Sequence, residues 1–150
     1  MKVSACLLAS VFFILSSFSG CAPPPESALV IKVIDGDTIT LEGGLKVRYI
    51  GIDTPELYPK EEPLAREASE GNRTLVEGKR VRLEPDTSDK DKYGRLLRYV
   101  YVVGKMVNAE LLKLGLAEAK AYPPDTRYQS LFDGLETETR SKKLGIWAQK

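Results

Sequence analysis

The sequence predicts a small, mainly β protein of the α+β class, built as a five-stranded OB-fold barrel with three helices. Three observations indicate this fold. Short segments with alternating polar and apolar residues follow one another, turn dipeptides rich in glycine separate them, and segments with helical periodicity interrupt and follow them. The length of 150 residues suits one such domain preceded by a short extension.

The extension, residues 1–20, has the pattern of an export signal peptide. Lys2 precedes an apolar run at residues 5–18, and small residues follow the run. The run is too short to span a membrane comfortably. Residues 18–21 resemble a bacterial lipoprotein signal, which is cut before a cysteine that then receives lipid, here Cys21. Plain secretion, with cleavage near Cys21, is the alternative.

Residues 21–27 contain three consecutive prolines, which favour an extended linker ahead of a folded domain at residues 28–150. The chain has two cysteines, and Cys6 would leave with the signal. Cys21 would then be the only cysteine of the mature chain, which excludes an intramolecular disulfide and favours a lipid anchor. We therefore expect an exported protein that is bound to the cell-envelope membrane through Cys21, or secreted if Cys21 carries no lipid.

The folded domain is expected to begin with a three-stranded meander. Residues 29–34 are rich in valine and isoleucine, and residues 38–41 and 45–49 alternate polar and apolar side chains. Asp-Gly at 35–36 and Gly-Gly at 43–44 are typical of tight turns. The three strands are therefore expected to pair in the order in which they occur.

A helix, two strands and two further helices are expected in the rest of the domain. A Thr-x-x-Gln pattern at residues 126–129 predicts a capping box that opens the last helix. Leu131 and Leu135 are expected on the buried face of this helix, and Gly145 is expected to end it. The predicted ranges are a helix at 64–77, strands at 80–84 and 95–103, a helix at 107–114 and the last helix between 126 and 145.

The composition excludes several classes of reaction. The chain has no histidine, so Ser-His and Cys-His nucleophiles and the histidine-rich zinc hydrolases are excluded. Loss of residues 1–20 would lower the formal net charge from +1 to zero, so any attraction to nucleic acid must come from a local patch. The chemistry must depend on carboxylates, arginines, lysines, tyrosines or a hard metal ion.

Two clusters of carboxylates are candidates for a cation site. Asp35 and Asp37 flank a glycine, so in an extended backbone both side chains face the same way. Asp53 and Glu56 follow the third strand, with Thr54 between them. Carboxylate, carbonyl and water oxygens are the ligands that calcium prefers. Each cluster taken alone is also typical of a solvated turn or of helix capping.

Arg48 and Arg95 are candidates for binding a phosphate. A guanidinium group keeps its proton and matches two oxygens of a phosphate at once, including the charged oxygens of a transition state. Taken alone, each arginine is more typical of a solvated surface position than of a phosphate site.

Taken together, these segments resemble the staphylococcal nuclease (thermonuclease) family over residues 28–147. The resemblance implies a five-stranded barrel with three helices and a calcium-dependent phosphodiesterase that acts on DNA and RNA. The matching segments are Asp-Gly-Asp-Thr at 35–38, Arg48, Asp-Thr-Pro-Glu at 53–56, Asp-Lys-Tyr-Gly-Arg at 91–95, Gly-Lys-Met-Val-Asn at 104–108 and Leu-Gly-Ile-Trp at 144–147.

The resemblance also implies roles for individual residues. Asp37, Asp53 and the carbonyl of Thr54 would bind Ca²⁺, with Asp35 beside them. Water would attack phosphorus and displace the 5′-oxygen, which leaves a 3′-phosphate. The catalytic residues would be Glu56 as general base with Arg48 and Arg95 as transition-state stabilisers, and the substrate-binding residues would be Lys92, Tyr93 and Tyr122.

Two features depart from the family pattern. The segment at residues 57–63 is short and carries Glu61 and Glu62, and acidic residues there would weaken binding of a nucleic-acid strand. Tyr122 and Tyr128 are both candidates for stacking on bases, and the sequence does not choose between them.

The leading hypothesis is therefore a monomeric, calcium-dependent nuclease with DNA and RNA as substrates. A non-catalytic nucleic-acid-binding OB-fold lipoprotein is the alternative, although such a protein is expected to lack several of Arg48, Glu56 and Arg95. A structural calcium-binding lipoprotein would explain the aspartates but gives neither arginine a role.

Overall fold

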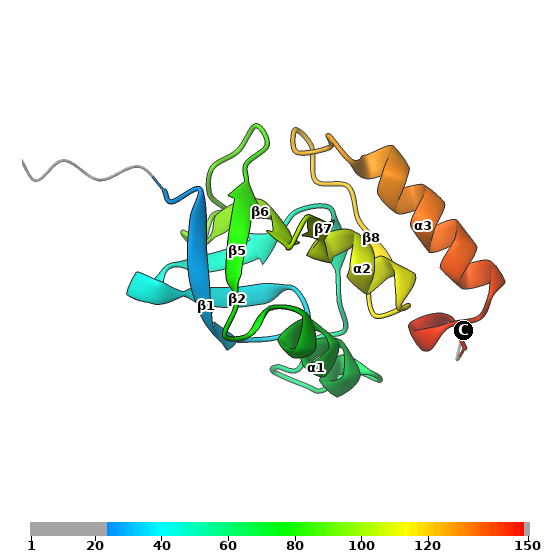
Figure 1. Ribbon diagram of the computed structural model, residues 1–150. Helices are drawn as coiled ribbons and strands as arrows, with labels where there is room; N and C mark the ends of the chain where they lie inside the picture. Colours follow the sequence, from blue (N-terminus) through cyan, green and yellow to red (C-terminus); the bar gives the residue numbers. More distant parts are fainter. Residues whose placement is uncertain (1–23, 149–150) are drawn as a thin grey trace, which may run out of the picture.

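A computed structural model describes residues 24–148 and confirms the five-stranded barrel with three helices (Figure 1). The expected signal peptide and Cys21 lie outside the described residues. Each barrel strand lies within two residues of its predicted bounds. The strands are β1 (Ser27–Val33), β2 (Thr38–Leu41), β3 (Lys46–Tyr49), β5 (Arg80–Glu84) and β6 (Leu96–Val102).

The barrel is closed by one parallel pairing. β1 pairs antiparallel with β2 and with β5, while β2 pairs with β3 and β5 with β6 in the same manner. β3 and β6 then pair in parallel, with Val47 opposite Leu96 and Arg48 opposite Leu97. Alternation along these strands turns Val47 and Leu96 into the fully buried interior. The same pairing places Arg48 beside the start of β6.

Three helices cover the barrel: α1 (Ala65–Val76), α2 (Val107–Lys113) and α3 (Gln129–Ser141) (Figure 1). α1 packs against β1 and α2, and α3 packs against α2. The part of the chain at residues 24–148 contains no helix with the length and apolar character of a membrane span. The short elements are η1 (Glu42–Gly44), β4 (Ile52–Asp53), β7 (Lys105–Met106), β8 (Glu118–Ala119) and η2 (Gly145–Ala148).

Asn108 connects α2 to the barrel. Its side chain is fully buried, donates to the carbonyl of Ile50 over 2.9 Å and accepts the N–H of Val100 over 3.0 Å. A buried amide that satisfies two backbone groups links segments far apart in the sequence, and its hydrogen bonds offset the cost of removing it from water. Asn108 therefore fixes α2 relative to β6 and to the loop after β3.

The start and the buried face of α3 differ from the prediction. The helix begins at Gln129 rather than Thr126, and no side chain caps it, so the predicted capping box is wrong. Leu131 is 48% exposed, and Phe132 is the fully buried residue instead. The ring of Phe132 packs 6.1 Å from that of Tyr99, and this aromatic contact sets the rotation of the helix.

The end of α3 also differs from the prediction. The helix ends at Ser141, and Gly145 instead opens the short helix η2. A Cβ atom on Gly145 would lie 2.1 Å from the carbonyl oxygen of Gly115, so the two backbones touch at this point. The N–H of Ile146 donates to that same carbonyl over 2.9 Å. Gly145 is therefore needed for close packing rather than for ending the helix.

Candidate active site

One pocket of about 600 Å³ gathers most of the side chains that the sequence identified. It lies where β3, the loop at 91–95 and the segment after β8 meet. Four cations and four carboxylates line it together with aromatic side chains, so it is strongly polar. The charged and aromatic lining residues are Arg48, Tyr49, Asp53, Glu56, Asp91, Lys92, Tyr93, Arg95, Lys120, Tyr122 and Asp125.

Asp37 lies at the edge of this site and is 2% exposed. Its carboxylate accepts the N–H of Thr54 over 3.0 Å and the hydroxyl of Thr54 over 3.1 Å. Asp35 accepts the N–H of Asp37 over 3.1 Å and so shapes the turn. A Cβ atom on Gly36 would lie 2.5 Å from Oγ1 of Thr54, so only glycine allows this approach. Burial raises the pKa of Asp37 to about 7, although the charge of Arg48 opposes this rise.

Arg48 lies between the two aspartates that were expected to bind a cation. Its Nη1 donates to the carbonyls of Tyr49 and Ile52, each over 2.9 Å. Its Nη2 lies 2.7 Å from Oδ1 of Asp53 and 3.1 Å from Oδ2 of Asp37. Because backbone carbonyls fix one side of the guanidinium group, its orientation is set before any ligand binds.

The two aspartates form a pair of oxygen donors suited to a calcium ion. One atom, Nη2 of Arg48, contacts both carboxylates, so Asp37 and Asp53 converge on a small volume. Among residues 24–148, no group of three or more carboxylates forms a ready-made cage around a cation. The remaining donor expected from the sequence is the backbone carbonyl of Thr54, and waters complete such sites. The residues present therefore fit Ca²⁺, which binds only through oxygen.

Glu56 lies in the loop after β4 and lines the pocket. Its backbone N–H donates to the carboxylate of Glu62 over 2.9 Å, and its carbonyl accepts the N–H of Glu62 over 2.9 Å. Partial burial raises the pKa of Glu56, and the negative charges of Asp35 and Asp53 raise it further. Glu56 is therefore a stronger base than a solvated glutamate.

The acidic residues of the loop at 57–63 are engaged by residues that flank the loop. Glu61 forms a two-pronged ion pair with Arg66 at 2.7 and 2.8 Å, and Glu62 binds the backbone of Glu56. Neither side chain lines the pocket that contains Arg48. We therefore find no direct contact through which Glu61 or Glu62 would weaken binding of a strand in this pocket.

Asp91 orients Arg95, a role that the sequence did not assign. Its Oδ2 accepts Nε of Arg95 over 2.6 Å, and its Oδ1 accepts the N–H groups of Tyr93 and Arg95 over 2.9 and 3.0 Å. Gly94 has a φ of 81°, the left-handed conformation that this turn requires. An aspartate followed by glycine three positions later was the available signal, because tight turns favour aspartate at their first position and glycine at their fourth.

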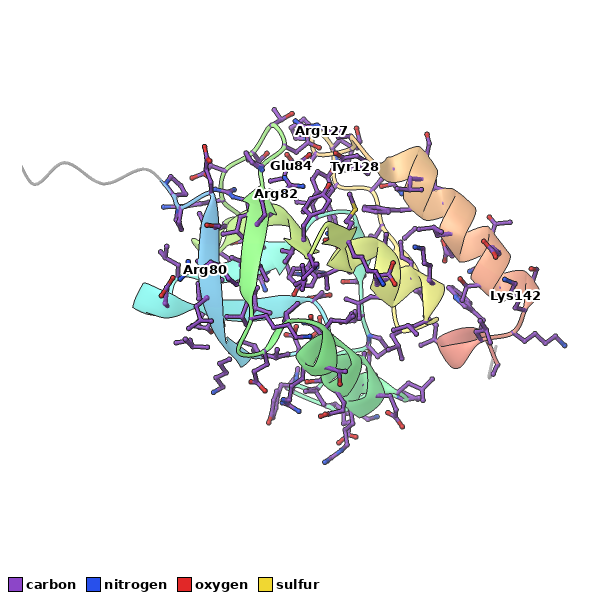
Figure 2. The ribbon with its side chains drawn as sticks, in the orientation of Figure 1. Arg80, Arg82, Glu84, Arg127, Tyr128 and Lys142 are labelled. Atoms are coloured by element: carbon purple, nitrogen blue, oxygen red, sulfur yellow. The ribbon has the colours of Figure 1, made fainter. Side chains whose placement is uncertain are left out.

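Lys92, Tyr93 and Tyr122, the three residues expected to bind substrate, all line the pocket. Lys92 and Tyr93 are exposed, and Tyr93 is 72% exposed at the rim. The ring of Tyr128 instead packs 4.6 Å from Tyr99, and its hydroxyl donates to Glu84 over 2.7 Å (Figure 2). Tyr122 is therefore the better placed of the two tyrosines to meet a base.

Lys120 is a pocket residue that the sequence did not identify as functional. Its Nζ lies 2.5 Å from Oδ2 of Asp53. The antiparallel pairing of β4 with β8 places Ile52 opposite Ala119 and Asp53 opposite Glu118, so Lys120 lies opposite Gly51 and its side chain reaches Asp53 diagonally. Two-residue strands leave almost no pattern in a sequence, so this proximity gave no signal.

The fold and this pocket define an OB-barrel protein with arginines and carboxylates in one site, the composition of a phosphodiester hydrolase. The family model described as Staphylococcal nuclease homologue matches residues 46–149. The chain therefore belongs to the staphylococcal nuclease family.

Curated relatives agree with this assignment. The chain is 44% identical to a thermonuclease of Staphylococcus intermedius over 128 residues, which is 81% of this chain and 76% of the relative. It is 40% identical to a thermonuclease of Staphylococcus hyicus over 125 residues, which is 79% of this chain and 74% of the relative. It is 46% identical to endonuclease YncB of Bacillus subtilis over 126 residues, which is 79% of this chain but only 60% of the relative.

Proposed function

We propose that the protein is a calcium-dependent nuclease that hydrolyses DNA and RNA by attack of water at phosphorus, with 3′-phosphate products. The observation that carries this proposal is the pocket itself, where Glu56, Arg48 and Arg95 face one volume beside the aspartate pair. The names of the relatives, thermonuclease and endonuclease, support the same class of reaction.

Asp37, Asp53 and the carbonyl of Thr54 are the residues that we propose to bind Ca²⁺. A bound Ca²⁺ supplies positive charge against the phosphate that is attacked. Arg48 contacts both aspartates, so the guanidinium group and the cation would neutralise the two carboxylates together. A buried carboxylate such as Asp37 requires such compensation, because its desolvation is costly.

Glu56 is the proposed general base. Its carboxylate accepts a proton from water as the water oxygen forms a bond to phosphorus and the bond from phosphorus to the 5′-oxygen breaks. The 5′-oxygen leaves and takes a proton from solvent water, and Glu56 returns its proton to solvent, so one product ends in a 3′-phosphate and the other in a 5′-hydroxyl. The raised pKa of Glu56 favours this proton transfer.

Arg48 and Arg95 are the proposed stabilisers of the transition state. Charge grows on the equatorial oxygens during attack, and fixed guanidinium groups stabilise it without reorganising. Backbone carbonyls fix Arg48, and the carboxylate of Asp91 fixes Arg95 at 2.6 Å. Lys92, Tyr93 and Tyr122 would meet the terminal phosphate, the sugar or a base at the rim.

Removal of calcium is expected to abolish cleavage. Purified protein should cut single-stranded DNA, duplex DNA and RNA with calcium present and should stop cutting when EDTA is added. End-group analysis of the products should find 3′-phosphates. Cleavage that continues at an unchanged rate in EDTA would overturn the proposed mechanism.

The alternative of a non-catalytic nucleic-acid-binding protein is less well supported. Such a protein has no use for a base with a raised pKa, yet Glu56 lies in the same pocket as both arginines. A folded protein that binds strands in calcium but never cuts them would favour this alternative. A purely structural calcium protein also leaves Arg95 and its partner Asp91 without a role.

We also propose that the protein is exported and anchored to the membrane by lipid on Cys21, which lies outside the described residues. Cells fed a radiolabelled fatty acid should incorporate label into the wild-type protein. The Cys21→Ser variant should lose the label and pass into the soluble fraction, because the acyl chains supply the membrane affinity. Equal partitioning of both proteins would refute the anchor and leave plain secretion.

A further inference from the structure

Lys120 is a pocket cation for which the proposed mechanism has no use. Its Nζ contacts Oδ2 of Asp53, while Arg48 occupies Oδ1 of the same carboxylate. Both oxygens of Asp53 are thus paired with cations in this structure. The side chain of Lys120 is 49% exposed, whereas that of Arg48 is 11% exposed. Lys120 is therefore the partner of Asp53 that is free to reach a ligand in solvent.

The backbone fixes where Lys120 can reach. Its N–H donates to the carbonyl of Gly51 over 2.9 Å, which continues the pairing of β4 with β8. Its ammonium group lies 5.4 Å from the centre of the Tyr122 ring. The charge is therefore positioned beside both Asp53 and Tyr122, in the pocket that Arg95 also lines.

The type of side chain suits a phosphate. An ammonium group on a flexible stem carries three donors and binds phosphate oxygens as a point charge. If Asp53 bound a cation, the cation would offset the negative charge of this carboxylate. The attraction of Asp53 for Lys120 would then be weaker. A strand phosphate in the pocket would then be the nearest anion available to Lys120.

We propose that Lys120 is a further substrate-binding residue, which contacts a backbone phosphate of the nucleic-acid strand and pairs with Asp53 when no strand is bound. This inference rests on the proposed function, because the same pocket must receive the strand. It assigns a role to a side chain from the segment after β8.

The test measures binding of a fluorescent single-stranded oligodeoxynucleotide over a series of salt concentrations at one fixed calcium concentration, in a Glu56→Gln background that suppresses cleavage during the measurement. The logarithm of the binding constant falls linearly with the logarithm of the salt concentration. Loss of one phosphate contact makes this slope less steep by about 0.7 for a single strand. Lys120→Met should show this loss, and Lys120→Arg should retain the wild-type slope. An unchanged slope in Lys120→Met, or no binding by the wild type at the lowest salt, overturns the inference.

Lys142→Met is the matched control. Lys142 is also about half exposed and also lies 2.5 Å from a carboxylate, that of Glu138, but it is at the far end of α3 (Figure 2). Its removal should leave the slope unchanged. An equal loss in this variant would show that general charge, rather than a contact in the pocket, is being measured, and would overturn the inference.

The same measurement in an Asp53→Asn protein distinguishes two roles of Lys120: contact with phosphate and neutralisation of Asp53. If Lys120 acts only by neutralising Asp53, its removal has no effect in an Asp53→Asn protein, and the inference fails. If Lys120 contacts phosphate, the slope still falls by about 0.7 in that background. If Lys120→Met lowers the salt dependence of binding but the wild-type protein does not cleave nucleic acid in calcium, the nuclease proposal fails. Lys120 would then remain a strand-binding residue.

Discussion

Glu56→Gln is expected to lower kcat by about 10²- to 10⁴-fold, the contribution typical of a positioned general base. Glutamine has nearly the same shape but cannot accept the proton of the attacking water. The backbone contacts of Glu56 with Glu62 involve the N–H and carbonyl groups, so the substitution leaves them intact. The loop should therefore keep its conformation, and the loss should fall on turnover rather than on folding.

The pH dependence offers a second readout for Glu56. Partial burial is the largest cause that raises the pKa of Glu56, and the general base must be ionised to accept a proton, so wild-type kcat should fall as the pH drops through the pKa of this group. This acid limb should be absent from the residual activity of Glu56→Gln. Glu67→Gln, on the exposed surface of α1, is the control. It should retain the wild-type kcat and the same fall of kcat at low pH. A folded Glu56→Gln protein with a near-normal rate would show that another group takes the proton.

Arg95→Gly is expected to lower kcat by about 10²- to 10³-fold, the loss typical of removing one fixed donor to a transition state. The turn should survive, because Asp91 still accepts the N–H groups of residues 93 and 95. Arg95→Lys should recover little of the rate, since an ammonium group keeps the charge but lacks the planar pair of donors. Steady-state rates at saturating substrate would measure both effects.

Arg127→Gly is the matched control for Arg95. Arg127 is also a loop arginine paired with a carboxylate, that of Glu84 at 3.1 Å (Figure 2). It does not line the pocket, so its loss should leave kcat unchanged. Equal losses in the two variants, or a near-normal rate for Arg95→Gly, would remove Arg95 from the proposed mechanism.

The barrel was predictable because each of its strands leaves a local pattern. Alternation and turn dipeptides located all five strands to within two residues. The parallel pairing of β3 with β6 left no such pattern, because it depends on contacts between distant segments. α3 shows a different limit, since helical periodicity does not say which of two adjacent apolar residues meets the core. Phe132 takes that place, and Leu131 lies at the surface.

The site was predictable where its residues lie in short motifs. Arg48 and Asp53 are five residues apart, and the structure joins them at 2.7 Å. Asp91 and Lys120 escaped assignment for different reasons. Asp91 acts through Arg95 and so resembles any aspartate in a turn, whereas Lys120 reaches Asp53 through a pairing of two-residue strands.

Closure of the barrel by β3 and β6 makes the pocket a product of complete folding. Arg48 lies in β3, one residue before its end, and Arg95 immediately precedes β6. The two arginines therefore come together only when these distant parts of the chain pair. An unfolded chain carries every reactive side chain but no pocket. If the protein is exported, as we propose, and folds only afterwards, the cell that makes it needs no separate inhibitor to protect its own nucleic acid during synthesis.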